Sequence, residues 1–224
     1  MLDPVESRDS PFITPFKAAT WMPEVDRVGR EQIPVLRPPT WHGPPDRLVA
    51  FDKRHPDKGS SAAFLHFYVA DRKLAHILQR PQRYLHSFAS YAGLISPDFS
   101  LYRSMPPHQR VLHTWANRAV GAYYQAHGLA VIANVRWATQ EDFAFCFLGV
   151  PVRSVVAISI HGCSRNSEDR YHFRTGLAEL LDQLEPHTVI VHGPMPRDVF
   201  DRVRARSDFI HFPSDINRAH AMAG

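Results

Sequence analysis

Three side chains that can bind metal ions or transfer protons each follow a short apolar run of this sequence. They are Asp98, His161 and His192. Imidazole and carboxylate groups together suit Zn²⁺, Mn²⁺ or Fe²⁺, and a water bound to such a metal can attack a phosphate or carbonyl group near neutral pH. We therefore predict Asp98, His161 and His192 as catalytic residues and as ligands of a divalent metal cofactor, although their spacing matches no local ligand motif.

Further polar and aromatic side chains near the same apolar runs could bind a substrate. Two of them share the string PDFSLY with Asp98, and three lie at the end of the run at 130–135. The glycine turn in HGCSRNS (161–167) precedes a predicted helix, where backbone N–H groups can bind phosphate with help from an arginine. The predicted substrate-binding residues are Ser100, Tyr102, Asn134, Arg136, Trp137 and Arg165.

Each of these assignments has a structural alternative. The chain has 14 histidines, and a partly buried histidine is often simply hydrogen-bonded to the backbone. Asp98 follows a proline and could organise a turn through hydrogen bonds from its side chain to the backbone. Glycine turns also connect strands to helices without binding anything. The residue types alone leave both interpretations open.

The apolar runs themselves predict strands, because nearly continuous apolar segments are typical of strands covered on both faces. They lie at residues 48–51, 64–69, 94–96, 130–135, 143–147, 155–160, 188–191 and 209–212. Apolar residues at helical spacing predict helices over 105–127, 168–184 and 197–206. Strands that alternate with helices favour a parallel sheet, and the carboxyl-terminal edge of such a sheet would gather the polar residues.

The predicted fold class is α/β: a mainly parallel sheet with crossover helices, either (β/α) barrel-like or doubly wound. Barrels of this kind typically have about 250 residues, and this chain has 224. Ten of the 19 prolines lie before residue 57, and proline fits neither a helix interior nor a central strand. We therefore divide the chain into a proline- and aromatic-rich extended arm at 1–45 and a single α/β domain at 46–224.

Five segments carry a resemblance to a known family. They read HFYVAD (66–71), SPDFSLYRSMP (96–106), NRAVGAYYQAHGLAVIANVRW (117–137), FAFCFLGVP (143–151) and VVAISIHGC (155–163). Over about residues 46–195 the chain resembles the domain of unknown function 4417 family, which is found in phages, plasmids and other mobile elements. The resemblance implies no activity. It implies that Ala70 and Leu148 stand where family members often carry acids, so no mechanism is expected at these two positions.

Composition narrows the classes of function. The formal net charge is +4, which is mild for a protein dedicated to nucleic-acid binding. No segment approaches the roughly 20 apolar residues that cross a bilayer, and no secretory signal is evident. The two cysteines form no zinc-ligand spacing. We expect a cytoplasmic protein without membrane contact.

Two functional hypotheses follow. The first is a metal-assisted hydrolase or nuclease-like enzyme that acts on a phosphate-bearing substrate, a nucleotide or nucleic acid, at the carboxyl ends of the strands. The second is a non-enzymatic protein that binds a host factor, nucleic acid or its own copy. It would use the arm, through which it could form a homo-oligomer, and a basic C-terminal helix with Arg197, Arg202, Arg204 and Arg206. The sequence does not decide between the two.

Overall fold

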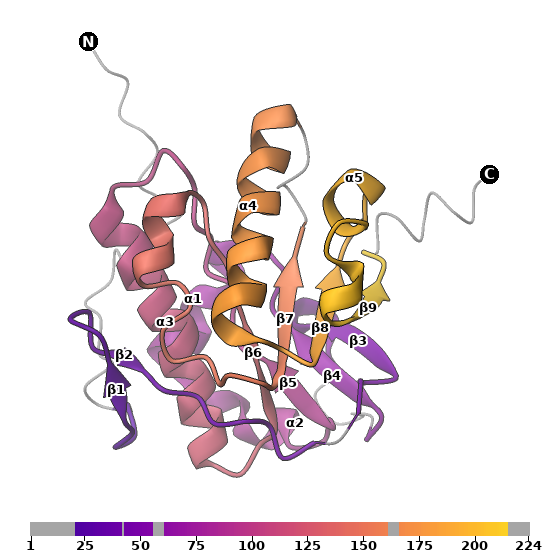
Figure 1. Ribbon diagram of the computed structural model, residues 1–224. Coiled ribbons are helices and arrows are strands. Elements are labelled where there is room, and N and C mark those ends of the chain that lie inside the picture. The colour runs from indigo at the N-terminus through magenta and orange to yellow at the C-terminus, as the bar shows by residue number, and fades with distance from the viewer. Residues whose placement is uncertain (1–20, 42, 56–60, 161–165, 215–224) are drawn as a thin grey trace.

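Seven parallel strands form the main sheet of this protein (Figure 1). The computed structural model describes residues 21–41, 43–55, 61–160 and 166–214. The strands are β3 (Arg47–Ala50), β4 (Ala63–His66), β5 (Gly93–Ile95), β6 (Val131–Asn134), β7 (Val155–Ser159), β8 (Thr188–His192) and β9 (Asp208–Phe212). They pair in the order of the chain, each parallel to the next. The predicted parallel α/β fold is confirmed.

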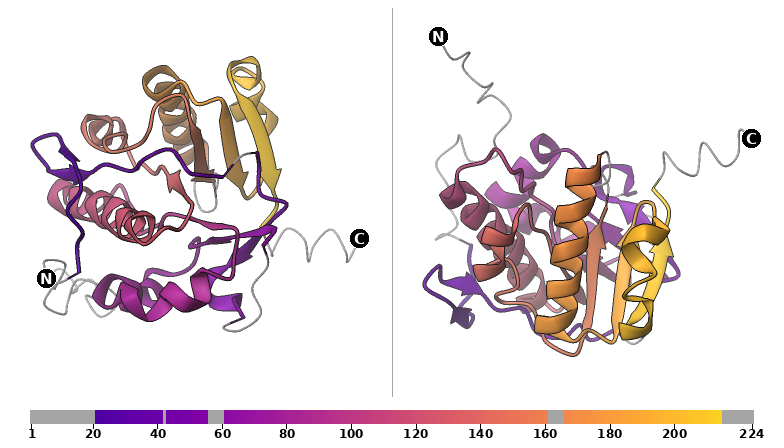
Figure 2. Two further views of the ribbon diagram at one scale, coloured as in Figure 1. Left: turned by 90° about the horizontal axis from the view of Figure 1, so that it is seen from below. Right: turned by 45° about the horizontal axis from the view of Figure 1, so that its top comes forward.

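Helices connect the strands and cover the outer face of the sheet. They are η3 (Phe51–Lys53), α1 (Asp71–Gln79), η4 (Pro81–Tyr84), α2 (Leu85–Phe88), α3 (Pro107–Ala126), η5 (Gln140–Ala144), α4 (Ser167–Leu184), α5 (Arg197–Phe200) and η6 (Arg204–Arg206), where η marks short 3₁₀ helices. Crossovers between parallel strands are right-handed, so a sheet in sequential order receives its helices on one side. Figure 2 (left) shows the sheet curled with the helices outside it. The sheet is a half-barrel with β3 and β9 at its edges, which corresponds to the barrel-like arrangement.

Side chains on the inner face of the curled sheet form an apolar layer. Successive residues of a strand point to opposite faces. In β7, Val155 and Ala157 therefore point inward, whereas Val156 and Ile158 pack under the helices. Each strand of the sheet contributes to the inner layer, which consists of Leu48, Phe64, Ile95, Ile132, Val155, Ala157, Ile190 and Phe212.

Polar side chains replace this apolar layer at the carboxyl ends of the strands. In β4, β6, β7 and β8, the residue two positions beyond an inner apolar residue is polar and buried. These residues are His66, Asn134, Ser159 and His192. Because the side-chain period of a strand is two, the alternation in the sequence turns them inward. The interior therefore ends in a polar layer, and the candidate site lies beside it.

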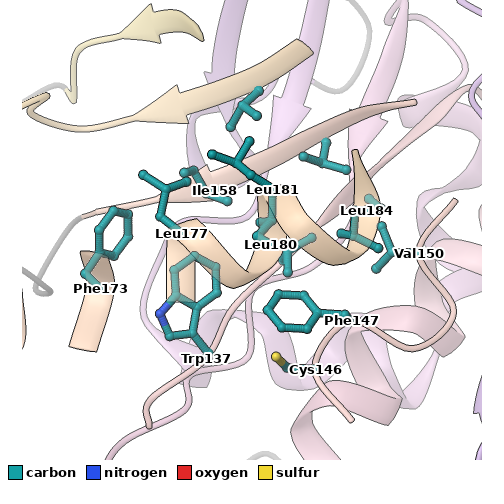
Figure 3. Packing of buried hydrophobic residues seen from close by; sticks show 14 of the residues in the cluster. Trp137, Cys146, Phe147, Val150, Ile158, Phe173, Leu177, Leu180, Leu181 and Leu184 are labelled. Atoms are coloured by element: carbon teal, nitrogen blue, oxygen red, sulfur yellow. The ribbon is translucent and has the colours of Figure 1, made fainter. Parts of the chain in front are cut away.

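Helix α4 packs its apolar stripe against β7 and against the segment that follows β6 (Figure 3). Gly176 marks the point where α4 meets Trp137, because a Cβ added there would lie 2.1 Å from the indole Nε1. That Nε1 donates a hydrogen bond to the carbonyl oxygen of His172 at 3.1 Å. The missing side chain of Gly176 thus allows the indole to lie directly against the helix.

The predicted strand at 143–147 is wrong. The segment begins in η5 and continues in turns. The Asp142 carboxylate accepts the backbone N–H groups of Ala138, at 2.7 Å, and Thr139, at 3.0 Å, so the chain turns instead of extending. Phe147 is buried against α4. An apolar run that is buried in a turn has the same sequence pattern as a buried strand.

The predicted helices at 105–127 and 168–184 are confirmed as α3 and α4. The predicted helix at 197–206 is shorter, because α5 ends at Phe200 and η6 follows after an interruption. The helical segment α1–η4–α2 between β4 and β5 was not predicted. Within the described residues, no helix has the length and apolar character needed to cross a membrane.

Residues 21–41 of the arm pack on the domain. They include the antiparallel pair β1 (Arg27–Val28) and β2 (Ile33–Pro34). The Trp21 ring meets Tyr123 edge-on with centroids 5.6 Å apart, and Trp41 meets Phe64 in the same way at 5.7 Å. Figure 2 (left) shows the chain crossing the end of the sheet before it enters β3. Both tryptophan side chains therefore pack against the α/β domain of the same chain.

Candidate functional site

A cavity of about 520 Å³ lies at the carboxyl-terminal edge of the sheet, and we call it the rim cavity. Its walls come from the segments after β4, β5 and β6, from the end of β7 and from the first turns of α4. The lining residues include Tyr68, Asp98, Ser100, Tyr102, Arg136, Trp137, Ser159, His172 and Phe173. Ligands of parallel α/β folds bind at this edge, which makes the rim cavity the candidate site.

Asp98 is held in the wall of the rim cavity by two neighbours, and it is only 7% exposed. The Asn134 Nδ2 donates to Asp98 Oδ1 at 2.8 Å, and the Arg136 Nη1 donates to Asp98 Oδ2 at 2.8 Å. Both partners come from the end of β6, whereas Asp98 comes from the loop after β5. A buried carboxylate requires such compensation by a cation and by hydrogen bonds. The network therefore joins two adjacent strand ends.

Tyr68 extends this network to the end of β4. Its hydroxyl donates to Asn134 Oδ1 at 3.1 Å. Burial raises the pKa of the Tyr68 phenol well above its ordinary value, and the nearby Asp98 carboxylate raises it further, whereas Arg136 lowers it. The phenol therefore stays protonated at neutral pH and acts as a donor. Because Asn134 accepts from Tyr68 and donates to Asp98, the orientation of its amide is fixed.

His192 packs behind Tyr68. The two rings are stacked, with centroids 4.6 Å apart, and the His66 ring lies at the same centroid distance from His192. The Ser159 Oγ lies 3.3 Å from the His192 Nδ1. Ser159 lines the rim cavity, so His192 is connected to the cavity through Ser159 and Tyr68.

Asp71, the first residue of α1, binds Ser100 in the cavity wall. The Asp71 Oδ1 accepts from the Ser100 Oγ at 3.0 Å and from the Ser100 backbone N–H at 3.2 Å. Burial raises the pKa of Asp71, the hydrogen bonds from Ser100 lower it, and the Asp98 carboxylate raises it. A carboxylate with a raised pKa beside a hydroxyl is a stronger proton acceptor than an ordinary aspartate.

Helix α3 fixes the loop that carries Asp98 and Ser100. The Asn117 side chain accepts from the Phe99 backbone N–H at 2.7 Å and donates to its carbonyl at 3.3 Å. The His113 Nδ1 lies 2.7 Å from the Ser100 carbonyl oxygen. A carbonyl only accepts, so Nδ1 carries the hydrogen. Burial lowers the pKa of His113, which favours the neutral imidazole. The hydrogen bond from Nδ1 holds the loop against α3.

Arg118 fixes the end of β6 from the other side. Its guanidinium donates to the carbonyl oxygens of Asn134 at 2.6 Å, Cys146 at 2.9 Å and Leu148 at 3.2 Å. Burial lowers the pKa of Arg118 to about 10. The side chain thus bridges α3, the end of β6 and the turns after η5, and it positions the backbone from which Asn134 and Arg136 project.

The structure brings several predicted site residues together. Those in the walls of the rim cavity are Asp98, Ser100, Tyr102, Arg136 and Trp137, with Asn134 bonded to Asp98 and His192 in the polar layer. His161 and Arg165 lie outside the described residues. In the part of the chain that is described, no three His, Cys, Asp or Glu side chains are grouped so that they could hold a metal ion. The metal site, which includes His161, stays a prediction.

Sequence reasoning missed Tyr68, Ser159 and Asp71 as site residues. A signal existed for the first two, because Tyr68 and Ser159 continue the inward alternation of β4 and β7 past the last apolar residue. Asp71 follows the predicted strand at 64–69, so chain direction places it at the carboxyl edge of the sheet, but it was not included among the predicted site residues.

The basic segment near the C-terminus forms local ion pairs. Arg206 pairs with Asp182 at 2.6 Å, and Arg204 lies 4.0 Å from Asp201. These contacts connect η6 to α4 and to the residue that follows α5. They leave the segment with less unbalanced positive charge than its composition suggests.

Comparisons with known proteins agree with the sequence resemblance. The family model described as domain of unknown function (DUF4417) matches residues 25–212. The Gene 1 protein of Mycobacterium phage D29 is 37% identical over 164 residues, which are 72% of this chain and 60% of that protein. The Gene 1 protein of Mycobacterium phage L5 is 35% identical over 166 residues, which are 73% of this chain and 72% of that protein. No solved structure shows significant similarity.

Proposed function

The chain belongs to the domain of unknown function (DUF4417) family, and the family name assigns no activity. From the geometry of the site, we propose that the chain is an enzyme that acts on a phosphate-bearing nucleotide substrate in the rim cavity. One observation carries the proposal. Arg136 is held against the buried Asp98 in the wall of a cavity at the carboxyl edge of a parallel sheet. This edge is where α/β folds place their ligands.

Arg136 supplies the phosphate contact. A guanidinium has five N–H donors in one plane, so it can hold a carboxylate and a phosphate at the same time. Asp98 fixes its orientation in advance through the 2.8 Å contact. A cation that is already oriented stabilises charge on a phosphoryl oxygen without reorganisation. The Arg136 side chain is only 14% exposed, which limits screening by water.

Ser100 and Asp71 supply the path for a proton. Ser100 lines the cavity and its hydroxyl points at the Asp71 carboxylate. In the proposed step, a water bound to Ser100 attacks phosphorus and gives its proton to the Ser100 oxygen, while the Ser100 hydroxyl proton passes to Asp71. The bond from phosphorus to the leaving oxygen breaks, and that oxygen takes a proton from solvent. The raised pKa of Asp71 suits this acceptor role.

Aromatic side chains supply a surface for the nucleobase. Trp137, His172 and Phe173 line the cavity together, and the Trp137 and Phe173 rings lie with centroids 5.3 Å apart. Flat aromatic surfaces favour stacking of heterocyclic bases. A charged wall at Arg136 and an aromatic wall formed by Trp137 and the start of α4 match the two halves of a nucleotide.

A purely non-enzymatic interaction role has less support from the described residues. Trp21 and Trp41 of the arm pack on the domain, and Arg206 pairs with Asp182. The arm and the basic C-terminal segment, which this role assigns to a partner, therefore already make contacts with other parts of the same chain. A protein that binds nucleotides without converting them is the outcome that would favour this role.

The test is a panel of nucleoside mono-, di- and triphosphates incubated with the purified protein, with product release followed by chromatography and binding by calorimetry. The panel is run with Mn²⁺ and with a chelator, because Asp98, His161 and His192 are the predicted metal ligands. The Arg136→Gln variant should lose at least about tenfold in affinity, since a charge-assisted hydrogen bond contributes about 1.5–3 kcal/mol. The Ser100→Ala variant should bind the nucleotide but convert it more slowly.

The matched control is Arg153→Gln. Arg153 lies in the turn before β7, at the opposite end of that strand from the cavity. Its side chain is 77% exposed and pairs with Glu185. This variant should bind and convert nucleotides as the wild type does. Equal loss in both arginine variants, or no binding of any nucleotide by the wild type, contradicts the proposal.

A further inference from the structure

The charged side chains in the wall of the rim cavity form two groups of ion pairs. Among the described residues that line the cavity, those with a full charge are Asp98, Arg103, Arg136 and Asp169. Arg136 lies 2.8 Å from Asp98, and Arg103 lies 2.9 Å from Asp169. Glu168, which precedes Asp169 in the first turn of α4, forms a second ion pair with Arg103. Carboxylates therefore lie beside both arginines of the wall.

Arg103 binds carboxylates through both of its terminal nitrogens. Its Nη2 donates to Asp169 Oδ1 at 2.9 Å, and its Nη1 pairs with the Glu168 carboxylate. The hydrogen bond from Arg103 lowers the pKa of Glu168, so this carboxylate is charged at neutral pH. One guanidinium and two carboxylates give the group a net negative charge. A phosphate that approached Arg103 would have to displace carboxylates from the donors that it would use.

The same two carboxylates balance the N-terminal end of α4. The Asn166 side chain accepts the Asp169 backbone N–H at 2.8 Å, and Glu168 and Asp169 are the acids of the first turn. Acids at this position stabilise the positive end of a helix dipole, which otherwise attracts phosphate groups. At this end of α4, the wall therefore presents negative charge to a ligand.

The charge of the wall limits how many phosphates a nucleotide in the cavity can carry. The volume of about 520 Å³ suits one nucleotide-sized group, with its phosphate at Arg136 and its base at Trp137. Each additional phosphate adds negative charge to a cavity whose wall already contains Asp98 and Asp169. Repulsion between like charges is strong where water is partly excluded. The wall therefore favours a ligand with one phosphate over ligands with two or three.

Resting on the proposed function, we infer that the substrate of the rim cavity is a nucleoside monophosphate, and that Glu168 and Asp169 select against di- and triphosphates. The reaction is then hydrolysis of a phosphate monoester. The oxygen of water forms a bond to phosphorus, the bond from phosphorus to the ester oxygen of the nucleoside breaks, and this oxygen takes a proton from solvent. The products are a nucleoside and inorganic phosphate.

Calorimetry with the mono-, di- and triphosphates of adenosine, guanosine, cytidine and uridine tests the selectivity. Binding is compared at constant ionic strength with a chelator, because a metal ion on the phosphates would neutralise the charge that is compared. The monophosphate should bind at least about tenfold more tightly than the triphosphate of the same nucleoside. Release of inorganic phosphate from the monophosphate, with Mn²⁺ and with the chelator, measures conversion separately.

Substitution of the two carboxylates tests whether they cause the selectivity. Asp169→Asn removes one charge and one partner of Arg103, so the affinity for the triphosphate should rise about tenfold. The affinity for the monophosphate should change by less than about threefold. Glu168→Gln, at a side chain that is 66% exposed, should shift the preference in the same direction by about threefold. The matched control is Asp182→Asn, which removes a carboxylate paired with Arg206 in the last turn of the same helix and should keep the wild-type preference.

The outcomes separate this inference from the proposed function. A triphosphate that binds the wild type as tightly as the monophosphate overturns the inference and leaves the nucleotide proposal standing. A monophosphate preference that neither acidic variant reduces overturns the role of Glu168 and Asp169. If the monophosphate binds selectively but releases no phosphate, the proposed enzyme is wrong and the selectivity of the cavity stands. If no nucleotide binds the wild type, with Mn²⁺ or with the chelator, both proposals are overturned.

Discussion

The amide nitrogen of Asn134 donates to the Asp98 carboxylate at 2.8 Å, across the gap between the end of β6 and the loop after β5. The amide oxygen of the same side chain accepts from the Tyr68 hydroxyl at 3.1 Å. One carboxamide thus joins groups from three consecutive strand ends. It fixes the carboxylate against which Arg136 is oriented.

The shared amide predicts strong coupling between Asn134 and Tyr68. Asn134→Ala leaves the buried Asp98 oxygen and the Tyr68 hydroxyl without this partner, so it should lower the free energy of unfolding by about 1–3 kcal/mol. Tyr68→Phe removes one hydroxyl and should cost about 1 kcal/mol. The double variant should cost less than the sum, with a coupling of about 0.5–1.5 kcal/mol in urea unfolding. Additive effects of the two substitutions would show that the hydrogen bond contributes nothing.

Replacement of Arg118 even by lysine should destabilise the protein. Its guanidinium serves three backbone carbonyls, and the single nitrogen of a lysine cannot reach all three with the same geometry. Arg118→Lys should therefore lower the free energy of unfolding by at least about 2 kcal/mol. Arg153→Lys, at a side chain that is 77% exposed, should stay within about 0.5 kcal/mol of the wild type. Urea unfolding of both variants makes the comparison, and a stable Arg118→Lys protein would contradict it.

Asp71 should make stability depend on pH in the acidic range. Its pKa is raised in the folded state, chiefly by burial, so the folded state binds the proton more tightly than the unfolded state does. Stability from this group is then fully present below the ordinary aspartate pKa of about 3.9, and it is lost as the pH rises through the folded pKa. Asp71→Asn cannot ionise. The stability of the wild type relative to this variant should therefore fall as the pH rises from about 4.

Unfolding curves measured at a series of pH values test this expectation. Asp201→Asn serves as the control, because the Asp201 carboxylate is 53% exposed and lies 4.0 Å from Arg204. The control should stay within about 0.5 kcal/mol of the wild type in its free energy of unfolding. A difference between wild type and Asp71→Asn that stays constant, or grows as the pH rises, would sink the idea.

The sequence by itself determined the parallel α/β class and the edge of the sheet at which the candidate site lies. Strand runs that are apolar on both faces, with α3 and α4 between them, require a covered parallel sheet. Chain direction then puts Asp98, Arg136 and Trp137 at the carboxyl edge, where the structure has the rim cavity. These predictions depend on local periodicity, which each segment carries independently of its neighbours.

Only the tertiary structure decided which side chains meet. Strand order and curvature depend on how distant segments pair, and no local pattern encodes that pairing. The contact of Asp71 with Ser100 needs α1 to start beside the loop after β5, and the three carbonyls that Arg118 holds lie 16 to 30 residues further along the chain. The segment at 143–147 turns because Asp142 binds the backbone of Ala138 and Thr139. Burial makes such hydrogen bonds obligatory, and burial is a property of the assembled fold.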